Sequence, residues 1–308
     1  MTLPIRLSDR SLAIGTSALV KRYRQHRALQ GLDLDVPTGA VYLLVGPNGA
    51  GKSTTMKILM GLLEPTSGTA HVLGLDTGAE GALVRANVGY VPETPAWGHG
   101  WMHVARLLHH HAAYFPAWDL PYAQRLINFF GLPVRQRVKT LSKGQSRRLH
   151  LVMALAHRPP VLILDEPLDG LDPVMRDQTL RALVAHLADT PTTVLLSTHH
   201  VGEVERLADH IGVLRSGQLC VQSGTEQLAA RLRRYRGVVP PGWTDTSGLN
   251  GGVVRRTTTR DEIDWIVWGD ENEVTQRLAH SGAALRSVDR LSLEEATIAL
   301  LTPAGDTQ

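Results

Sequence analysis

The stretch GPNGAGKST, residues 46–54, decides the fold of this chain. It fits the pattern G-x-x-x-x-G-K-[ST], and it lies between a short apolar run at residues 41–45 and a segment, residues 53–63, whose apolar side chains recur at helical spacing. Glycines let the backbone turn its N–H groups around phosphates, and the helix that follows contributes the positive end of its dipole. We therefore predict a strand, a phosphate-binding loop and a helix, rather than a chance glycine-rich turn. The loop residues predicted to bind a nucleotide are Gly46, Pro47, Asn48, Gly49, Ala50, Gly51, Lys52, Ser53 and Thr54.

A pair of carboxylates follows a second apolar run. Residues 161–164 read as a buried strand that ends at Asp165 and Glu166, and ligands of open α/β sheets bind at the carboxyl ends of such strands. An acidic pair after a strand is, on its own, more often part of a loop or a helix cap. After a phosphate loop, we expect Asp165 and the Ser53 hydroxyl to ligate Mg²⁺. Glu166 is then free to polarise the attacking water as general base, and Lys52 neutralises phosphate charge during ATP hydrolysis.

The composition is that of an ordinary globular protein. The 308 residues are 43% apolar and 20% charged, which predicts one large domain and a smaller one. A net charge of +3 is too small to indicate nucleic acid, and the arginine-dense residues 231–236 read as a solvated helix face. The single cysteine, Cys220, excludes an internal disulfide, and no apolar run approaches the ~20 residues that cross a bilayer. With residues 1–15 read as a strand rather than a signal peptide, we expect a cytoplasmic protein.

Strands that alternate with helical patterns predict an α/β fold with a parallel sheet. The first domain is predicted to span residues 1–236, and residues 95–158 within it change to helical periodicities that indicate a helical subdomain. Glycine, proline and small polar residues at 237–252 predict a linker. Residues 253–308 hold strand-like and helix-like patterns, enough for a small α+β accessory domain.

Three further segments resemble the ATPases of ABC transporters. They are TLSKGQSRRL at residues 140–149, LILDEPLDGLDP at 162–173 and LLSTHH at 195–200. The resemblance covers roughly residues 10–225 and implies a P-loop NTPase core of mixed sheet with a helical subdomain that carries the signature. It also implies a dimer, of this chain with itself or with a paralogous ATPase, that binds two Mg-ATP. A separate integral membrane permease would then carry the substrate.

The resemblance assigns roles to single residues. Ser142, Gly144 and Gln145 belong to the signature, which grips the γ-phosphate of ATP held by the opposite subunit, and a serine hydroxyl with glycine N–H groups at a helix start suits an anion. Asp172 is expected to contact the other subunit. His199 is expected at the γ-phosphate and the attacking water, although a histidine after a strand is otherwise usually a packed or capping residue.

Tyr23 resembles the aromatic residue that stacks on adenine in this family. Two positions depart from the family pattern. Glu93 stands in place of the usual glutamine, so an anionic, acceptor-only group is expected at the metal, as a stronger ligand or as a repulsive charge. In the family this position also couples the nucleotide to the membrane partner. Lys143 replaces the first glycine of the signature and adds a cation near the phosphate.

A narrower resemblance concerns residues 114–133 and 291–301, which look like ATPases of type-2 ABC exporters, including those linked to drug or antimicrobial-peptide resistance. It predicts an export ATPase on the inner face of the cell membrane. A soluble ABC-type ATPase acting on ribosomes or nucleic acid remains an alternative, which the single phosphate loop and the absence of sustained heptads disfavour. An importer ATPase with a regulatory tail is a third possibility.

Histidines and tryptophans crowd into the predicted helical subdomain. Because no carboxylate or cysteine stands at ligand spacing from His99, His103 and residues 109–111, we expect surface or partner contacts rather than a metal site. Trp97 and Trp101 suit either an interface or core packing, and the sequence leaves both open.

Overall fold

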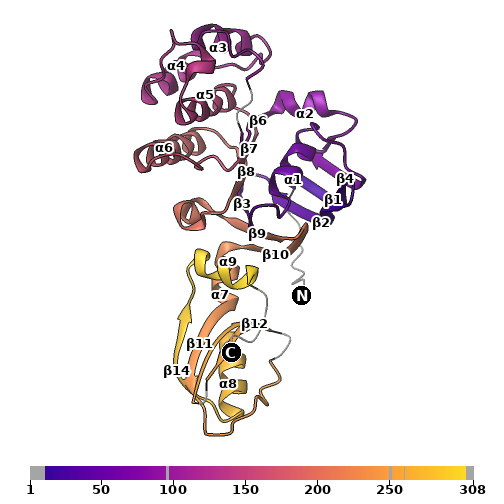
Figure 1. The fold of residues 1–308 in the computed structure, drawn as a ribbon, viewed down its shortest axis with the longest axis vertical. Helices are drawn as coiled ribbons and strands as arrows, with labels where there is room; N and C mark the ends of the chain where they lie inside the picture. The colour runs from indigo at the N-terminus through magenta and orange to yellow at the C-terminus, as the bar shows by residue number, and fades with distance from the viewer. Residues whose placement is uncertain (1–10, 95–96, 250–251, 260, 303–308) are drawn as a thin grey trace. The chain divides into compact units, whose positions relative to one another are not determined.

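The computed structural model describes residues 11–94, 97–249, 252–259 and 261–302, and the chain divides into two compact units (Figure 1). The larger unit runs to His199 and includes Leu214–Leu219, and the smaller unit comprises His200–Val213 and the chain from Cys220 onward. Of the predicted N-terminal strand, residues 1–10 lie outside the described residues, as do residues 95 and 96 of the predicted helical subdomain.

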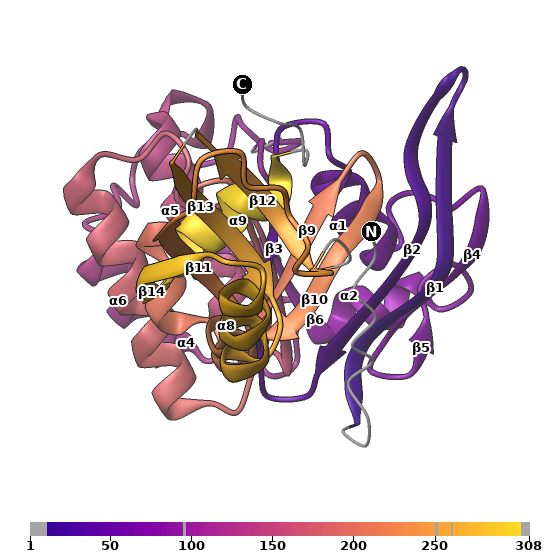
Figure 2. The same ribbon diagram turned by 90° about the horizontal axis from the view of Figure 1, so that it is seen from below.

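An antiparallel sheet opens the larger unit. Its strands, in the order β2-β1-β4-β5, are β1 (Leu12–Tyr23), β2 (His26–Pro37), β4 (Ser67–Val72) and β5 (Leu75–Asp76). Figure 2 shows β1 and β2 as a long hairpin, in which Tyr23 pairs with His26 at the turn. Leu19, Leu32 and Leu34 are fully buried, so the hairpin contributes one face to the core.

The second sheet has the order β10-β9-β3-β8-β7-β6. Its strands are β3 (Val41–Val45), β6 (Val88–Val91), β7 (Val161–Asp165), β8 (Thr193–Thr198), β9 (His210–Arg215) and β10 (Gln218–Gly224). The pairs β3–β8, β8–β7 and β7–β6 are parallel. All residues of β3, β7 and β8 are buried, which is typical of parallel strands covered on both faces. The predicted α/β fold with a parallel sheet is confirmed.

The helices of the larger unit fall into two groups, those next to strands of the parallel sheet in the chain and those of the helical subdomain. In the first group, α1 (Lys52–Leu59) follows β3, α6 (Pro173–Asp189) follows β7, and α2 (Gly81–Asn87) precedes β6. The second group, which lies together in Figure 1, is α3 (Val104–Ala112), α4 (Leu120–Phe129), the 3-10 turn η1 (Val138–Thr140) and α5 (Lys143–Leu155). Asp119 caps α4 by accepting a hydrogen bond from Tyr122 N at 2.8 Å and pairs with Arg158 at 2.9 Å. No described helix has the length and apolar character needed to span a membrane.

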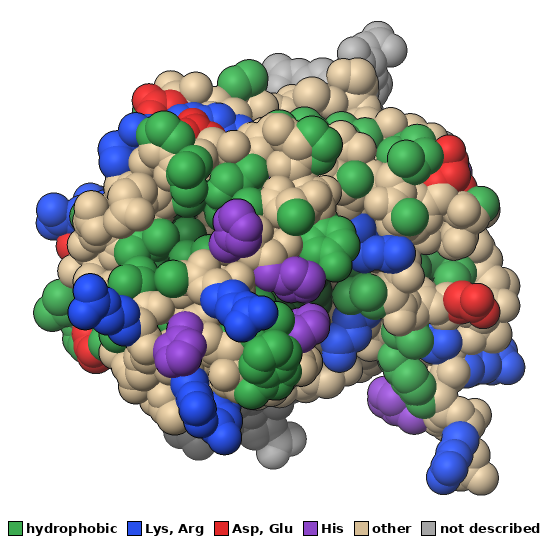
Figure 3. Space-filling model, turned by 90° about the horizontal axis from the view of Figure 1, so that it is seen from above, with side chains coloured by type: hydrophobic (Ala, Val, Ile, Leu, Met, Phe, Trp, Pro, Cys, Tyr) green, Lys and Arg blue, Asp and Glu red, His purple; other side chains and the backbone are tan. Residues whose placement is uncertain are grey.

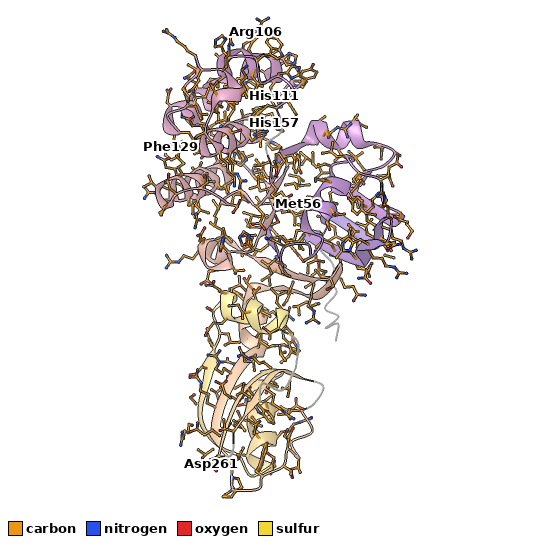
Figure 4. All side chains as sticks on the ribbon, viewed as in Figure 1. Met56, Arg106, His111, Phe129, His157 and Asp261 are labelled. Carbon is orange, nitrogen blue, oxygen red and sulfur yellow. The ribbon has the colours of Figure 1, made fainter. Side chains whose placement is uncertain are left out.

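Several histidines of this unit are packed rather than exposed. His157 stacks on Phe115 with 4.1 Å between ring centroids, and His111 lies 4.8 Å from the same ring; both labelled histidines lie close together in Figure 4. His186 is fully buried, with Nδ1 3.1 Å from the hydroxyl of Tyr122. Burial lowers the pKa of His111 and of His186 to about 4. His186 is therefore a neutral part of the core, and the half-buried His111 is neutral at physiological pH as well.

The buried histidines predict acid sensitivity. A folded-state pKa below the ordinary value of about 6.5 means that protonation favours unfolding. The contribution of such a histidine to the free energy of unfolding is therefore fully present above pH ~6.5 and is lost as the pH drops toward 4. For His186 the loss should reach about 3 kcal/mol by pH 4. We expect urea unfolding at pH 7.5 and pH 4 to show a smaller difference in His186→Gln than in the wild type. The exposed His280, changed to glutamine, is the control. An unchanged pH dependence in His186→Gln would refute the assignment.

The smaller unit contains an antiparallel sheet in the order β12-β13-β11-β14. Its elements are the turns η2 (Val201–Glu203) and η3 (Glu205–Leu207), the strands β11 (Leu232–Val238), β12 (Val253–Thr258), β13 (Glu262–Trp268) and β14 (Ala284–Arg290), and the helices α7 (Thr225–Arg231), α8 (Glu271–His280) and α9 (Leu293–Leu301). Trp265 and Tyr235 of the sheet and Leu278 of α8 are fully buried in one cluster. The predicted C-terminal α+β appendage is present.

The start of this sheet differs from the expected domain boundary. The boundary between residues 236 and 237 falls inside β11, and the arginine-dense residues 231–236 lie mostly in that strand rather than on a helix face. Arg234 pairs with Asp264 of β13 at 3.6 Å, and Arg236 pairs with Asp289 of β14 at 3.4 Å. The strand could not be predicted from the sequence, because the acidic partners of its arginines come from distant segments.

Candidate functional site

The phosphate loop joins β3 to α1 in a conformation that depends on glycine. Gly49 and Gly51 have φ of 81° and 113°, in the left-handed region that favours glycine. A Cβ at Gly51 would also lie 2.7 Å from the carbonyl oxygen of Ala28. Lys52 is buried and its Nζ donates to the carbonyl oxygen of Gly46 at 2.7 Å, which closes the loop on itself.

A cavity of about 290 Å³ opens over this loop. It is lined by Tyr23, His26, Ala28, loop residues 47–54, Glu93 and Glu166. Tyr23 is 44% exposed, so its ring face is available for stacking, and Lys21 Nζ lies 5.3 Å from the ring centroid. The predicted aromatic residue thus lies beside the loop. His26 was not predicted, although its place three residues after Tyr23 was a usable signal.

Ser53, Glu93 and Asp165 supply the oxygen atoms of a candidate metal position. The Ser53 hydroxyl donates to Glu93 Oε2 at 3.1 Å. Asp165 is buried, its Oδ1 accepts from Ser197 Oγ at 2.7 Å, and its Oδ2 accepts no hydrogen bond within the described residues. Burial, the largest cause, raises the pKa of the Asp165 carboxyl, and the charge of Glu93 raises it further. A hydroxyl beside a buried carboxylate with an unused oxygen suits a hard cation such as Mg²⁺.

Glu166 lies between two other side chains of the site, of which Lys52 is buried and His199 is 32% exposed. Its Oε1 is 3.2 Å from Lys52 Nζ, and its Oε2 is 2.9 Å from His199 Nδ1. Its φ is +48°, which is unusual for a residue with a side chain, and its backbone N–H donates to Ser197 Oγ at 2.9 Å. Of the three predicted catalytic residues, Lys52 and His199 thus each contact Glu166, through different oxygen atoms of its carboxylate.

The signature residues do not line this cavity. Ser142 caps α5, since its hydroxyl accepts from Gln145 N at 3.2 Å while the Gln145 side chain accepts from Ser142 N at 3.0 Å. Gly144 packs against Met175, where a Cβ would lie 2.7 Å from the sulfur. The first turn of α5 thus presents a serine hydroxyl and backbone N–H groups. These groups do not line the cavity over the phosphate loop of their own chain.

Two neighbouring residues have partners that the sequence did not reveal. Lys143 Nζ pairs with Asp169 at 3.1 Å, so the expected extra cation is partly neutralised in this conformation. Asp172 caps α6 by accepting from Met175 N at 2.8 Å. It therefore has a structural role within the chain besides the subunit contact predicted for it.

Trp97 and Trp101, for which the sequence left interface contact and core packing open, have different surroundings in the structure. Trp97 Nε1 donates to Ser146 Oγ at 2.5 Å, and its ring lies 3.9 Å from that of His150, so Trp97 packs against α5. Trp101 is 58% exposed, with the Arg106 guanidinium 6.0 Å from its ring centroid. Of the two, Trp101 is the one that is largely exposed to solvent.

Comparisons with known proteins show the family of this chain. The family model described as ABC transporter matches residues 29–169. The daunorubicin/doxorubicin resistance ATP-binding protein DrrA of Streptomyces peucetius is 41% identical over 71% of this chain and 68% of that protein. The daunorubicin resistance ATP-binding protein DrrA3 of Streptomyces coeruleorubidus is 32% identical over 96% of this chain and 93% of that protein. A solved ATP-binding subunit of an ABC transporter is 28% identical, covers 71% of this chain and 92% of its own, and has a TM-score of 0.64.

The second of these relatives is similar over the C-terminal unit as well as over the phosphate loop. From the match to the family model and the identity to these relatives, the chain belongs to the ABC transporter ATP-binding proteins, the ATPases of ABC transporters.

Proposed function

We propose that this chain dimerises around two Mg-ATP and powers the export of a substrate through a separate membrane permease. The observation that carries the proposal is the contact of the buried Glu166 with both Lys52 and His199 at the phosphate loop, with the signature helix outside the same cavity. Both relatives reported above are named as resistance ATP-binding proteins, which favours export of a drug-like compound.

The cavity residues divide the work of holding ATP. Tyr23 would stack on adenine, and the N–H groups of residues 46–54 would surround the β- and γ-phosphates at the positive end of α1. Lys52 would leave its ion pair with Glu166 and contact the phosphates, because their charge exceeds that of one carboxylate. Nucleotide binding would thus free Glu166 from its cationic partner.

The oxygen atoms of Ser53, Asp165 and Glu93 would hold Mg²⁺ beside the phosphates. When bound, this ion supplies positive charge against the negative charge of the transferred phosphoryl group. Occupation by a dication would also favour the ionised form of Asp165, which burial alone disfavours.

Glu166 would then accept a proton from the attacking water. Its Oε2 is already held by His199, so the carboxylate has a fixed orientation, and burial keeps competing water away from it. His199 would orient both the carboxylate and the γ-phosphate. These side chains supply the base and the charge stabilisation that phosphoryl transfer to water requires.

The signature residues would complete the site of a second copy. We expect Ser142→Ala to impair hydrolysis and to spare nucleotide binding to the monomer, because Ser142 does not line the cavity of its own chain. This substitution also removes the helix cap, at a cost of about 1 kcal/mol. Ser142→Asp keeps a good cap but places an anion towards the phosphate, so it should lose hydrolysis with unchanged thermal stability. Loss of monomer binding in Ser142→Ala would contradict a site shared between copies.

The helical subdomain would dock the permease. Between residues 94 and 164 the only acidic residue is Asp119, and the exposed basic residues are Arg106, Arg125, Arg135, Arg137, Lys139 and Lys143. Figure 3, which looks down on α3 and α4, shows basic, histidine and hydrophobic side chains together on this face. Arg137 pairs by its backbone with His103, beside the exposed Trp101. A surface that is both aromatic and basic fits an acidic, partly apolar cytoplasmic segment of the permease.

The experiment that tests the proposal is affinity purification of Glu166→Gln from detergent-solubilised membranes with Mg-ATP, followed by mass spectrometry. A multi-span membrane protein in stoichiometric amount supports the export reading and identifies the permease. Ribosomal proteins or nucleic acid without a membrane protein would instead support a soluble ATPase.

The same purification tests the docking face. We expect Trp101→Ala combined with Arg106→Glu to reduce permease recovery at least about tenfold, because it removes an exposed anchor and reverses one charge. Arg277→Glu on α8 is the control for charge reversal on an exposed helix. Equal recovery with all three proteins would place the docking site elsewhere.

A further inference from the structure

Arg147 of α5 contacts two segments of the catalytic site. Its Nη2 donates a hydrogen bond to the carbonyl oxygen of Glu93 at 2.6 Å, and its Nη1 donates to the carbonyl oxygen of Glu166. Arg147 is 2% exposed. The same helix begins with the cap Ser142, so one buried guanidinium connects the signature helix to the backbone of the candidate base and of the candidate metal ligand.

The Glu166 backbone is held on both sides. Its φ of +48° is a conformation that persists only where the surroundings fix it. The N–H donates to Ser197 Oγ on β8, and the carbonyl accepts from Arg147. Arg147 is thus the fixed point on the carbonyl side of a strained residue whose side chain faces Lys52 and His199.

The guanidinium of Arg147 is surrounded by carboxylates of the site. Burial, the largest cause, lowers the pKa of Arg147, while the carboxylates of Asp169, Glu166 and Glu93 act in the opposite direction. Its Nε has no hydrogen-bond partner among the residues that the structure describes. A buried cation needs compensating charge, and here the site itself provides it.

We propose that Arg147 is a positioning residue, which transmits the position of the signature helix to the backbone of Glu166 and Glu93. The inference rests on the proposed function, since it requires Glu166 to act on the attacking water. A shift of α5 moves the donor of both hydrogen bonds. The base is therefore aligned only while the helix stands where Arg147 reaches both carbonyl oxygens.

The next residue provides a matched control. Arg148 is also buried, at 8% exposure, and its Nη1 donates to the carbonyl oxygen of Phe130 at 3.0 Å and to Gln178 Oε1 at 3.3 Å. Neither partner belongs to the candidate site. Both arginines are buried side chains of α5, and they differ in the groups that accept their hydrogen bonds.

The test compares Arg147→Ala with Arg148→Ala in the full chain. We expect Arg147→Ala to lower kcat for ATP hydrolysis by about 10²-fold, as misplacement of a catalytic group by about 1 Å does, and to change KM and nucleotide affinity by less than about twofold. Arg147→Lys should recover only part of the loss, because an ammonium is a point charge that does not span two carbonyls. Added guanidinium at millimolar concentration should restore part of kcat in Arg147→Ala and none in Arg148→Ala.

A kcat within twofold of the wild type in Arg147→Ala, equal losses in the two variants, or no rescue by guanidinium would overturn the inference. Should Arg147→Ala not fold, Arg147→Met and Arg147→Lys serve the same comparison. The two failures are distinguishable, because a Glu166→Gln variant with the wild-type rate overturns the proposed function. An inactive Glu166→Gln with a fully active Arg147→Ala overturns only the positioning role.

Discussion

Glu166→Gln is expected to lower the rate of ATP hydrolysis at least about 10²-fold while ATP binding is retained. Glutamine has nearly the same shape, so the contact with His199 and the backbone bond to Ser197 can persist. It cannot accept a proton from water at neutral pH. The loss should therefore appear in kcat rather than in nucleotide affinity.

The structure adds a second expectation for this variant. In the described conformation Lys52 is paired with Glu166 at 3.2 Å, and ATP must compete with that ion pair for the ammonium group. Because glutamine is neutral, ATP affinity in Glu166→Gln should equal or exceed that of the wild type. Phosphate release at saturating ATP and equilibrium nucleotide binding measure the two effects separately.

The control for Glu166→Gln is Glu64→Gln, the same change at an exposed residue outside the cavity. It should hydrolyse ATP at the wild-type rate. An unchanged rate in Glu166→Gln would remove Glu166 from its role as base and leave its contact with Lys52 as an ordinary buried ion pair.

Lys52→Ala is expected to remove most of the ATP affinity. The lysine is buried, donates to the Gly46 carbonyl oxygen at 2.7 Å and is the cation nearest to Glu166 in the cavity. A hydrogen bond to a charged group contributes about 1.5–3 kcal/mol, so the Kd should rise by about 10- to 10²-fold. Equilibrium binding of a fluorescent ATP analogue measures the change.

Removal of Lys52 also leaves Glu166 buried without its cationic partner, which destabilises the loop. A thermal unfolding curve recorded with each binding titration separates loss of fold from loss of affinity. Lys57→Ala, an exposed lysine on the same helix, should bind ATP as the wild type does. Wild-type affinity in a folded Lys52→Ala would contradict the assignment of the loop.

The two substitutions should not be additive. Lys52 and Glu166 are in contact, and residues in contact usually show an interaction energy in a double-mutant cycle. In Lys52→Ala combined with Glu166→Gln, the loss of affinity should be smaller than in Lys52→Ala alone, since no unpaired carboxylate remains to repel the phosphates.

Parts of the fold and site that depend on local patterns could be predicted from the sequence. The loop at residues 46–54 requires glycines at positive φ, and the structure has them at Gly49 and Gly51. The buried strand before Asp165 is a continuous apolar run, as parallel strands are. Such features need only neighbours in the chain, so their residue spacing was sufficient.

Features that depend on distant partners could not be predicted. The strand β11 could not be predicted because its arginines pair with acidic residues far along the chain. The partners of Arg236, for example, are Asp264 and Asp289, which follow it by 28 and 53 residues. Lys143 is predicted to add a cation near the phosphate, and Asp169 lies beside it only in the folded chain. The predicted boundary between residues 236 and 237 falls inside β11 for the same reason.

The sequence by itself determined the α/β core, the phosphate loop, the acidic pair and the family, because each depends on residue types at fixed spacing along one strand, turn or helix. Only the tertiary structure decided that Lys52, Glu166 and His199 form one group, that the signature residues stand outside that cavity, and that Arg147 holds two carbonyl groups of the site. These arrangements join segments separated by tens to more than a hundred residues, and their geometry is set by how the strands and helices pack.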